Sequence, residues 1–172
     1  GFDALIYDSE EVDGFEIGLK SNLLDNNMRL NATYYKYEYT NLQVQLFDAA
    51  IIQFSTFNAG AVETEGFEAD LLWYTDIPGL SLRGQFAWTD ATNTGDFITP
   101  GGENLKGSKR SYSPEIAGSL GLSYDSGLSN GWRYNISTDA RYSDEYGWGT
   151  YIDSPMQDSF WINDVALSLY SE

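Results

Sequence analysis

The 172-residue sequence contains no cysteine and no histidine. Without cysteine the chain cannot form disulfides, thiol nucleophiles or thiolate metal sites, and without histidine it lacks imidazole ligands and every catalytic triad that needs a histidine base. No apolar run is long enough for a transmembrane helix, and the mean hydropathy is −0.37. A membrane β-strand would escape that criterion, because it presents a side chain to lipid only at every second residue.

Basic residues are also scarce. The chain has 9 lysines and arginines against 26 acidic residues, a net charge of −17. This balance argues against a nucleic-acid partner, for which a basic surface is expected. Aromatic residues reach 16% and glycine is frequent, a composition typical of β-strands separated by turns.

One hairpin, residues 58–91, contains the pattern that the rest of the chain repeats. After Gly66, apolar residues stand at every second position with acidic residues between them, so the two sets lie on opposite faces of a strand. A turn at 75–79 leads to a second strand with the same alternation. The apolar set is Phe67, Ala69, Leu71 and Trp73 on the first strand and Leu80, Leu82, Gly84, Phe86 and Trp88 on the second.

The same alternation predicts further strands at 12–21, from 28 to about 39, and at 116–124, 132–142 and 165–169. Residues 42–46 also alternate and could extend the second strand, after which 47–57 would cross to the hairpin. Short connections are expected at 22–27, 75–79 and 125–131, and long ones at 43–57, 92–113 and 143–158. In an up-and-down sheet all short turns then lie at one end and all long loops at the other, as in outer-membrane barrels.

We therefore predict an all-β fold, an antiparallel up-and-down meander of about seven long strands that forms part of a transmembrane β-barrel. Aromatic residues near the strand ends are expected to form two girdles: Trp73, Tyr74, Tyr124 and Trp132 beside the short turns, and Trp88 and Tyr142 near the long loops. Continuing the phase of Phe67 backwards places Glu65 and Glu63 on the apolar face. Either these residues lie above the hydrocarbon, or a bulge near Gly66 resets the register.

Several segments, in this order, resemble the late barrel strands of TonB-dependent outer-membrane receptors, and together they cover nearly the whole chain. The segments are Glu16 to Ser21, Leu30 to Tyr35 with Asn41-Leu42-Gln43, Asn58-Ala59-Gly60 followed by Glu63, Thr64, Gly66, Glu68 and Ala69, then Pro78-Gly79-Leu80, Leu82-Arg83-Gly84, Thr89-Asp90-Ala91 and Ser113-Pro114-Glu115.

The resemblance implies that residues 1–172 are one incomplete domain of a barrel of about 22 strands, without the plug and the final strands. It implies TonB-dependent import of a scarce nutrient at the bacterial outer membrane, by default a ferric siderophore, with a vitamin or glycan as alternatives. It further implies no enzymatic activity and no cofactor. The expected partners are a siderophore-like small molecule, outer-membrane lipid and lipopolysaccharide, and the TonB complex through the missing plug.

Candidate ligand residues lie on the expected long loops, and they fall into two groups. Lys106, Lys109, Arg110 and Tyr112 could attract an anionic ligand, or form a solvated loop or a lipopolysaccharide contact. Tyr146, Trp148 and Tyr151 could stack on an aromatic or sugar-like ligand, or pack among themselves. The strand phase also predicts a lumen-facing charged set, Glu68, Asp70, Arg83, Asp139 and Arg141, which could pair with a plug or with one another.

A second interpretation explains the composition equally well. A soluble, secreted β-sandwich that binds carbohydrate would also be acidic, rich in tyrosine and tryptophan, and free of cysteine. The two interpretations differ in what covers the apolar faces of the strands, which is a second sheet in the sandwich and lipid in the barrel. A third interpretation, a hydrolase that uses acidic residues, has no supporting group of catalytic residues. The carboxylates are many, but the sequence does not fix the separation between two of them that hydrolysis requires.

Overall fold

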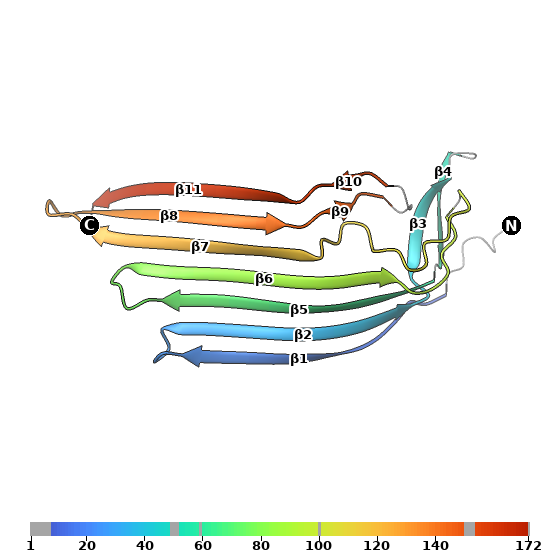
Figure 1. Ribbon diagram of the computed structural model, residues 1–172, viewed down its shortest axis with the longest axis horizontal. Helices are drawn as coiled ribbons and strands as arrows, with labels where there is room; N and C mark the ends of the chain where they lie inside the picture. Colours follow the sequence, from blue (N-terminus) through green and yellow to red (C-terminus); the bar gives the residue numbers. More distant parts are fainter. Residues whose placement is uncertain (1–7, 49–51, 59, 100, 150–153, 172) are drawn as a thin grey trace.

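Seven long strands form one antiparallel sheet in which neighbours in the chain are neighbours in the sheet (Figure 1). The computed structural model describes residues 8–48, 52–58, 60–99, 101–149 and 154–171. Each long strand has 12 to 14 residues, and together they confirm the predicted meander. Their bounds are β1 (Glu11–Leu23), β2 (Met28–Thr40), β5 (Ala61–Tyr74), β6 (Leu80–Asn93), β7 (Ile116–Gly127), β8 (Trp132–Ser143) and β11 (Phe160–Ser171).

The connections alternate in length as predicted. Short turns at 24–27, 75–79 and 128–131 lie at one end of the sheet, and the long connections at 41–60, 94–115 and 144–159 lie at the other (Figure 1). Gly79 shows why one turn is so tight. It adopts a φ of 84°, and an added Cβ atom would collide with the carbonyl oxygen of Asp125 on the neighbouring strand β7.

The strict alternation of side chains gives the sheet one apolar and one polar face. On the apolar face the side chains remain uncovered, with Ile17 68%, Leu120 53% and Val165 77% exposed. Among the described residues there is no second layer packed on this face, so the β-sandwich interpretation is wrong. No helix in the described part of the chain is long and apolar enough to cross a membrane.

Aromatic residues lie in rows at both ends of the apolar face. Near the long connections, Tyr34 stands opposite Phe67 and Phe67 opposite Trp88 in the strand register. Further along the same end, the ring centroids of Tyr142 and Trp161 are 5.0 Å apart. Near the short turns the apolar phase carries Trp73, Tyr124 and Trp132, whereas Tyr74 falls on the opposite phase. Tyr74 is therefore not part of the expected girdle.

Charged residues begin one step beyond the aromatic row at the long-connection end. The register between β2 and β5 is unbroken from Met28 opposite Trp73 to Thr40 opposite Ala61, so the alternative of a bulge near Gly66 is wrong. Glu63 and Glu65 stay on the phase of Phe67, and Lys36 Nζ lies 3.0 Å and 3.7 Å from their carboxylates. This row marks the height at which the apolar face ends.

Residues 42–46 do not extend β2, although their alternation had allowed it. Asn41 adopts a φ of 55°, a left-handed conformation that ends the strand. The chain then forms a separate hairpin of β3 (Gln43–Asp48) and β4 (Gln53–Asn58). Val44 of this hairpin packs with Phe97 and Leu105 of the next long connection, with Leu42 against them. Leu42 and Val44 therefore belong to a small loop core.

We expect Leu71→Arg and Leu120→Arg to destabilise the full-length protein in lipid by about 2–4 kcal/mol, the cost of a basic residue near the bilayer midplane. Leu82→Arg should cost less, because Leu82 stands opposite Trp73 in the aromatic row. Chemical unfolding in lipid vesicles measures these values. Gln85→Arg, on the polar face, is the control, and an equal cost for Gln85→Arg and Leu71→Arg would contradict a lipid-facing apolar surface.

Candidate ligand site

The polar face carries a chain of charge pairs in its middle. Arg83 donates from Nη2 to Asp139 at 3.1 Å, and Arg141 lies 3.4 Å from the other oxygen of Asp139 and also pairs with Asp164. Asp70 accepts two hydrogen bonds from the Asn31 amide, at 3.0 and 3.1 Å. Of the five predicted lumen-facing charges, Glu68 alone has no hydrogen bond or ion pair to a described residue.

A row of three tyrosines continues the polar face towards the long connections. Tyr35, Tyr37 and Tyr39 alternate along β2, with ring centroids 5.8 Å and 6.4 Å apart. The Tyr35 ring covers Gly66, where an added Cβ would lie only 2.5 Å from the tyrosine hydroxyl oxygen. The rings can lie along the wall because glycine leaves that space open. The sequence showed this tyrosine alternation, but not its relation to the glycine on β5.

The long connection after β6 folds back along the end of that strand. Asn93 N donates to Ser108 O at 2.9 Å, and Arg110 N donates to Ala91 O at 2.8 Å. Lys109 forms a bridge pair with Thr92 between them. In such an extended segment neighbouring side chains point to opposite sides. Lys109 therefore points to the side of the apolar face of the sheet, and Arg110 points to the side of the polar face.

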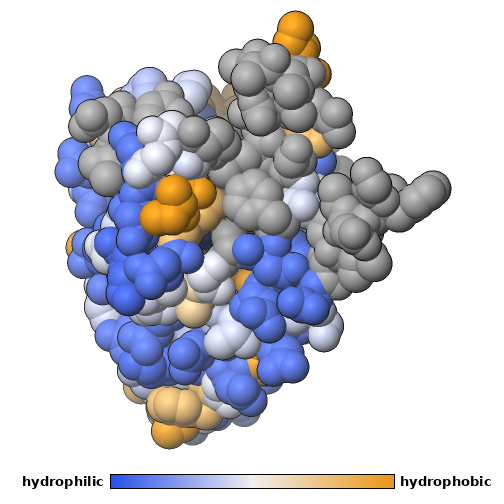
Figure 2. Space-filling model, turned by 90° about the vertical axis from the view of Figure 1, so that its right-hand side faces the viewer, coloured by the Kyte–Doolittle hydropathy of each residue, from blue (hydrophilic) through white to orange (hydrophobic). Residues whose placement is uncertain are grey.

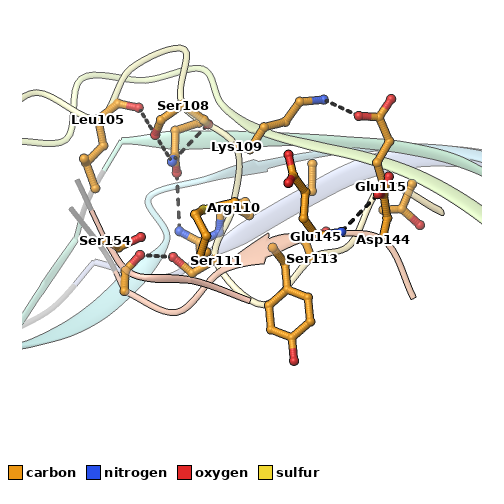
Figure 3. Close-up of a pocket in the computed structure, with 17 residues that line it drawn as sticks. Leu105, Ser108, Lys109, Arg110, Ser111, Ser113, Glu115, Asp144, Glu145 and Ser154 are labelled. Atoms are coloured by element: carbon orange, nitrogen blue, oxygen red, sulfur yellow. Dashed lines mark hydrogen bonds and ion pairs between the residues drawn. The ribbon is translucent and has the colours of Figure 1, made fainter. Parts of the chain in front are cut away.

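The predicted basic cluster is consequently divided. Lys109 Nζ lies 3.8 Å from Glu115 (Figure 3) and 2.8 Å from Asp90, and its hydrogen bond to Asp90 raises the pKa of the lysine. Lys106 Nζ lies 3.8 Å from Asp96. Both lysines are half-exposed and already paired with carboxylates. Three residues that are close in sequence thus do not form one basic patch.

Arg110 has a different environment. Its Nη1 donates to Asn93 Oδ1 at 3.3 Å, and no carboxylate of the described residues lies within ion-pair distance of it. Burial lowers the pKa of this guanidinium, although an arginine remains protonated at physiological pH. The buried Asn93, only 5% exposed, also donates to Ser108 Oγ at 2.9 Å. Asn93 was not among the predicted site residues and positions Arg110.

Arg110 borders two hollows. One, of about 300 Å³, is drawn in Figure 3 and includes Lys109, Glu115, Asp144 and Glu145. The other, of about 330 Å³, lies on the polar face and is called the Arg110 hollow below. It is lined by Tyr39, Leu42, Val62, Thr64, Thr89, Ala91, Arg110 and Ser113. The Arg110 hollow contains one cation and no carboxylate.

The predicted aromatic group lies on the other side of Arg110. The rings of Tyr112 and Tyr146 are 6.4 Å apart, and Tyr112 N donates to Gly147 O at 2.9 Å. Tyr146 lines the first hollow, whereas Tyr112 and Trp148 are 67% and 52% exposed. Tyr151 lies outside the described residues. The structure brings Tyr146 near Arg110 but does not bring Trp148 or Lys106 to either hollow.

The arrangement of Arg110 and the nearby tyrosines is suited to binding a ligand. Within the described ranges, no group of three or more aspartate or glutamate side chains is placed to hold a metal ion. Seen from the long-connection end, the described surface is mostly hydrophilic (Figure 2). A partly buried guanidinium beside tyrosines offers charge-assisted hydrogen bonds and ring stacking to a ligand.

We expect Asn93→Ala to loosen the connection 94–115, because Ser108 and Arg110 lose their side-chain partner; such a loss costs about 1–3 kcal/mol. Hydrogen–deuterium exchange of the full-length protein should show faster exchange at 105–110. Thr94→Ala, at an exposed neighbouring position, is the control. Unchanged exchange in Asn93→Ala would show that the backbone bonds alone hold the segment.

Comparison with solved structures supports the fold. The siderophore receptor PiuA from Acinetobacter baumannii matches 92% of this chain and 22% of its own, with 22% identity and a TM-score of 0.71. The ferric yersiniabactin uptake receptor FyuA from Yersinia pestis matches the same shares at 14% identity and a TM-score of 0.72. The ferric-catecholate import receptor Fiu from Escherichia coli K12 matches 94% and 21%, at 22% identity and a TM-score of 0.66.

The chain thus spans about a fifth of the length of these receptors. No curated protein matches it significantly. Residues 3–170, nearly the whole chain, match the family described as TonB dependent receptor-like, beta-barrel. The chain therefore belongs to the β-barrel domain of the TonB-dependent receptors, proteins of the bacterial outer membrane.

Proposed function

We propose that the complete protein imports a ferric siderophore across the outer membrane in a TonB-dependent cycle. In this proposal the present chain supplies barrel wall and extracellular loops. The observation that carries the proposal is the Arg110 hollow, which opens on the polar face at the end where the long connections lie. The three similar structures are all named as siderophore or ferric-complex receptors, which supports the same class of ligand.

The proposed activity is binding of the ligand followed by displacement of the plug, and no bond in the ligand is formed or broken. A chain of net charge −17 repels anions at long range, so an anionic chelate needs a local positive group. Arg110 is the best placed, because Lys106 and Lys109 already have carboxylate partners. Tyr112, Tyr146, Trp148 and Tyr151 remain candidate contacts for parts of the ligand outside the Arg110 hollow.

Two further partners are proposed from the two faces. The apolar face would contact lipid, with lipopolysaccharide head groups at the height of Lys36, Glu63 and Glu65, where the apolar surface ends. The polar face would contact the plug, through which the TonB complex acts. Glu68 is the best candidate for a plug contact, since it has no partner among the described residues, unlike Asp70, Arg83, Asp139 and Arg141.

Uptake of ⁵⁵Fe-labelled chelates by cells that carry or lack the full-length gene tests the proposal. We expect uptake of at least one ferric siderophore in an iron-starved strain, abolished when TonB is deleted. A labelled vitamin and a labelled oligosaccharide are offered to the same cells as alternative substrates. Uptake of one of these, with no ferric siderophore taken up, would show that the substrate class is wrong.

Charge reversal at Glu68 tests the plug contact. In the full-length receptor we expect Glu68→Lys to weaken plug seating, because a carboxylate that faces the plug is replaced by the opposite charge. Entry of a large antibiotic that the intact outer membrane excludes should rise several-fold. Gln85→Lys, a change on the same face, is the control. Equal permeability of both variants and the wild type would remove Glu68 from the plug contact.

A further inference from the structure

Building on the proposed function, we infer that the ligand is an anionic aryl chelate of iron, of the catecholate or phenolate class. One aromatic arm would enter the Arg110 hollow, with its ring against Tyr39 and its charged oxygens at Arg110. The inference goes beyond siderophore import in general, because it excludes uncharged chelates without aromatic rings as the preferred substrate.

The first argument is charge. The eight side chains around the Arg110 hollow include a single cation and no carboxylate, in a chain where acids outnumber bases by 26 to 9. Arg110 donates one hydrogen bond to the neutral side-chain amide of Asn93 and none to a carboxylate of the described residues. A partly buried guanidinium without a counter-ion favours an incoming anion, because both groups lose water and gain charge-assisted hydrogen bonds.

The other hollow beside Arg110 has a different set of charged residues. It shares Thr89, Ala91, Arg110 and Ser113 with the Arg110 hollow, but it also includes Glu115, Asp144 and Glu145. Lys109 offsets only the first of these acids directly, at 3.8 Å. An anion in that hollow would face uncompensated carboxylates. The charge distribution therefore directs an anionic ligand to the side of Arg110 where Tyr39 lies.

The second argument is the aromatic surface. Tyr39 ends the row that begins at Tyr35, and the Tyr35 and Tyr37 rings are inclined by only 30° to each other. Each of these two rings covers a glycine, Gly66 or Gly14, so the rings lie along the wall. The Tyr39 ring is tilted by 54° to the Tyr37 ring and lines the Arg110 hollow, so an aryl ring in the hollow can contact it in a tilted geometry.

The third argument is size. The volume of the Arg110 hollow, about 330 Å³, is at the lower end of the range of about 300–1,000 Å³ that is typical of small-molecule sites. It can hold one aromatic arm of a chelate. The rest of an iron complex, which is larger, would project from the polar face towards other parts of the receptor.

Binding to the purified full-length receptor tests the inference. The probes are ferric enterobactin, an anionic tris-catecholate, and ferrichrome, an uncharged tris-hydroxamate, followed by quenching of tryptophan fluorescence. We expect the wild type to prefer ferric enterobactin, Arg110→Gln to weaken its affinity at least tenfold, and Tyr39→Leu to weaken it several-fold. Arg110→Lys should retain more affinity than Arg110→Gln, and Lys106→Gln, the matched control, should bind like the wild type.

The outcomes separate the two proposals. Preference for ferrichrome, or unchanged affinity of both Arg110→Gln and Tyr39→Leu for ferric enterobactin, would overturn the aryl-chelate inference and leave siderophore import intact. Failure of the wild type to bind any ferric chelate, with no uptake in cells, would remove the proposed function itself. If Arg110→Gln does not assemble, Tyr39→Leu alone decides. A loss of stability without loss of affinity would assign Arg110 to a plug contact and overturn the inference.

Discussion

The structure depends on one constraint, the complete hydrogen bonding of the backbone in a sheet that crosses lipid. Unpaired N–H and C=O groups are too costly in hydrocarbon, so a membrane strand must pair along its whole crossing. All six pairings between the long strands keep one antiparallel register without a bulge. Because a slip of one residue would exchange the two faces of a strand, this unbroken register keeps the apolar and polar faces separate.

The sheet could be predicted from the sequence because its signal is local. Apolar residues at every second position, with turn residues between the runs, specify both the strands and their phase. The phase also placed Glu63 and Glu65 on the apolar side, but only the register between β2 and β5 showed that no bulge removes them. The sequence left open whether 42–46 extend the second strand, and the answer depends on Asn41, which adopts a left-handed conformation there and ends β2.

The candidate site could be predicted only in part, because it depends on contacts between distant segments. Lys109 and Arg110 are adjacent in sequence, yet an extended backbone directs them to opposite sides of the wall. Arg110 instead shares a hollow with Tyr39, which is 71 positions earlier in the numbering and reaches it only through the order of β2, β5 and β6. The hydrogen bond of Asn93 to Arg110 joins residues 17 positions apart and gave no local signal.

The small loop core has a consequence for how this receptor can change. Val44 comes from the connection between β2 and β5, whereas Phe97 and Leu105 come from the connection between β6 and β7. Surface loops vary in sequence more than the strands they connect, and they tolerate insertions and deletions. Here two of them share a hydrophobic centre, so a substitution in one alters the support of the other. Sequence drift in these two loops should therefore be correlated, and a new specificity would have to be acquired by the pair.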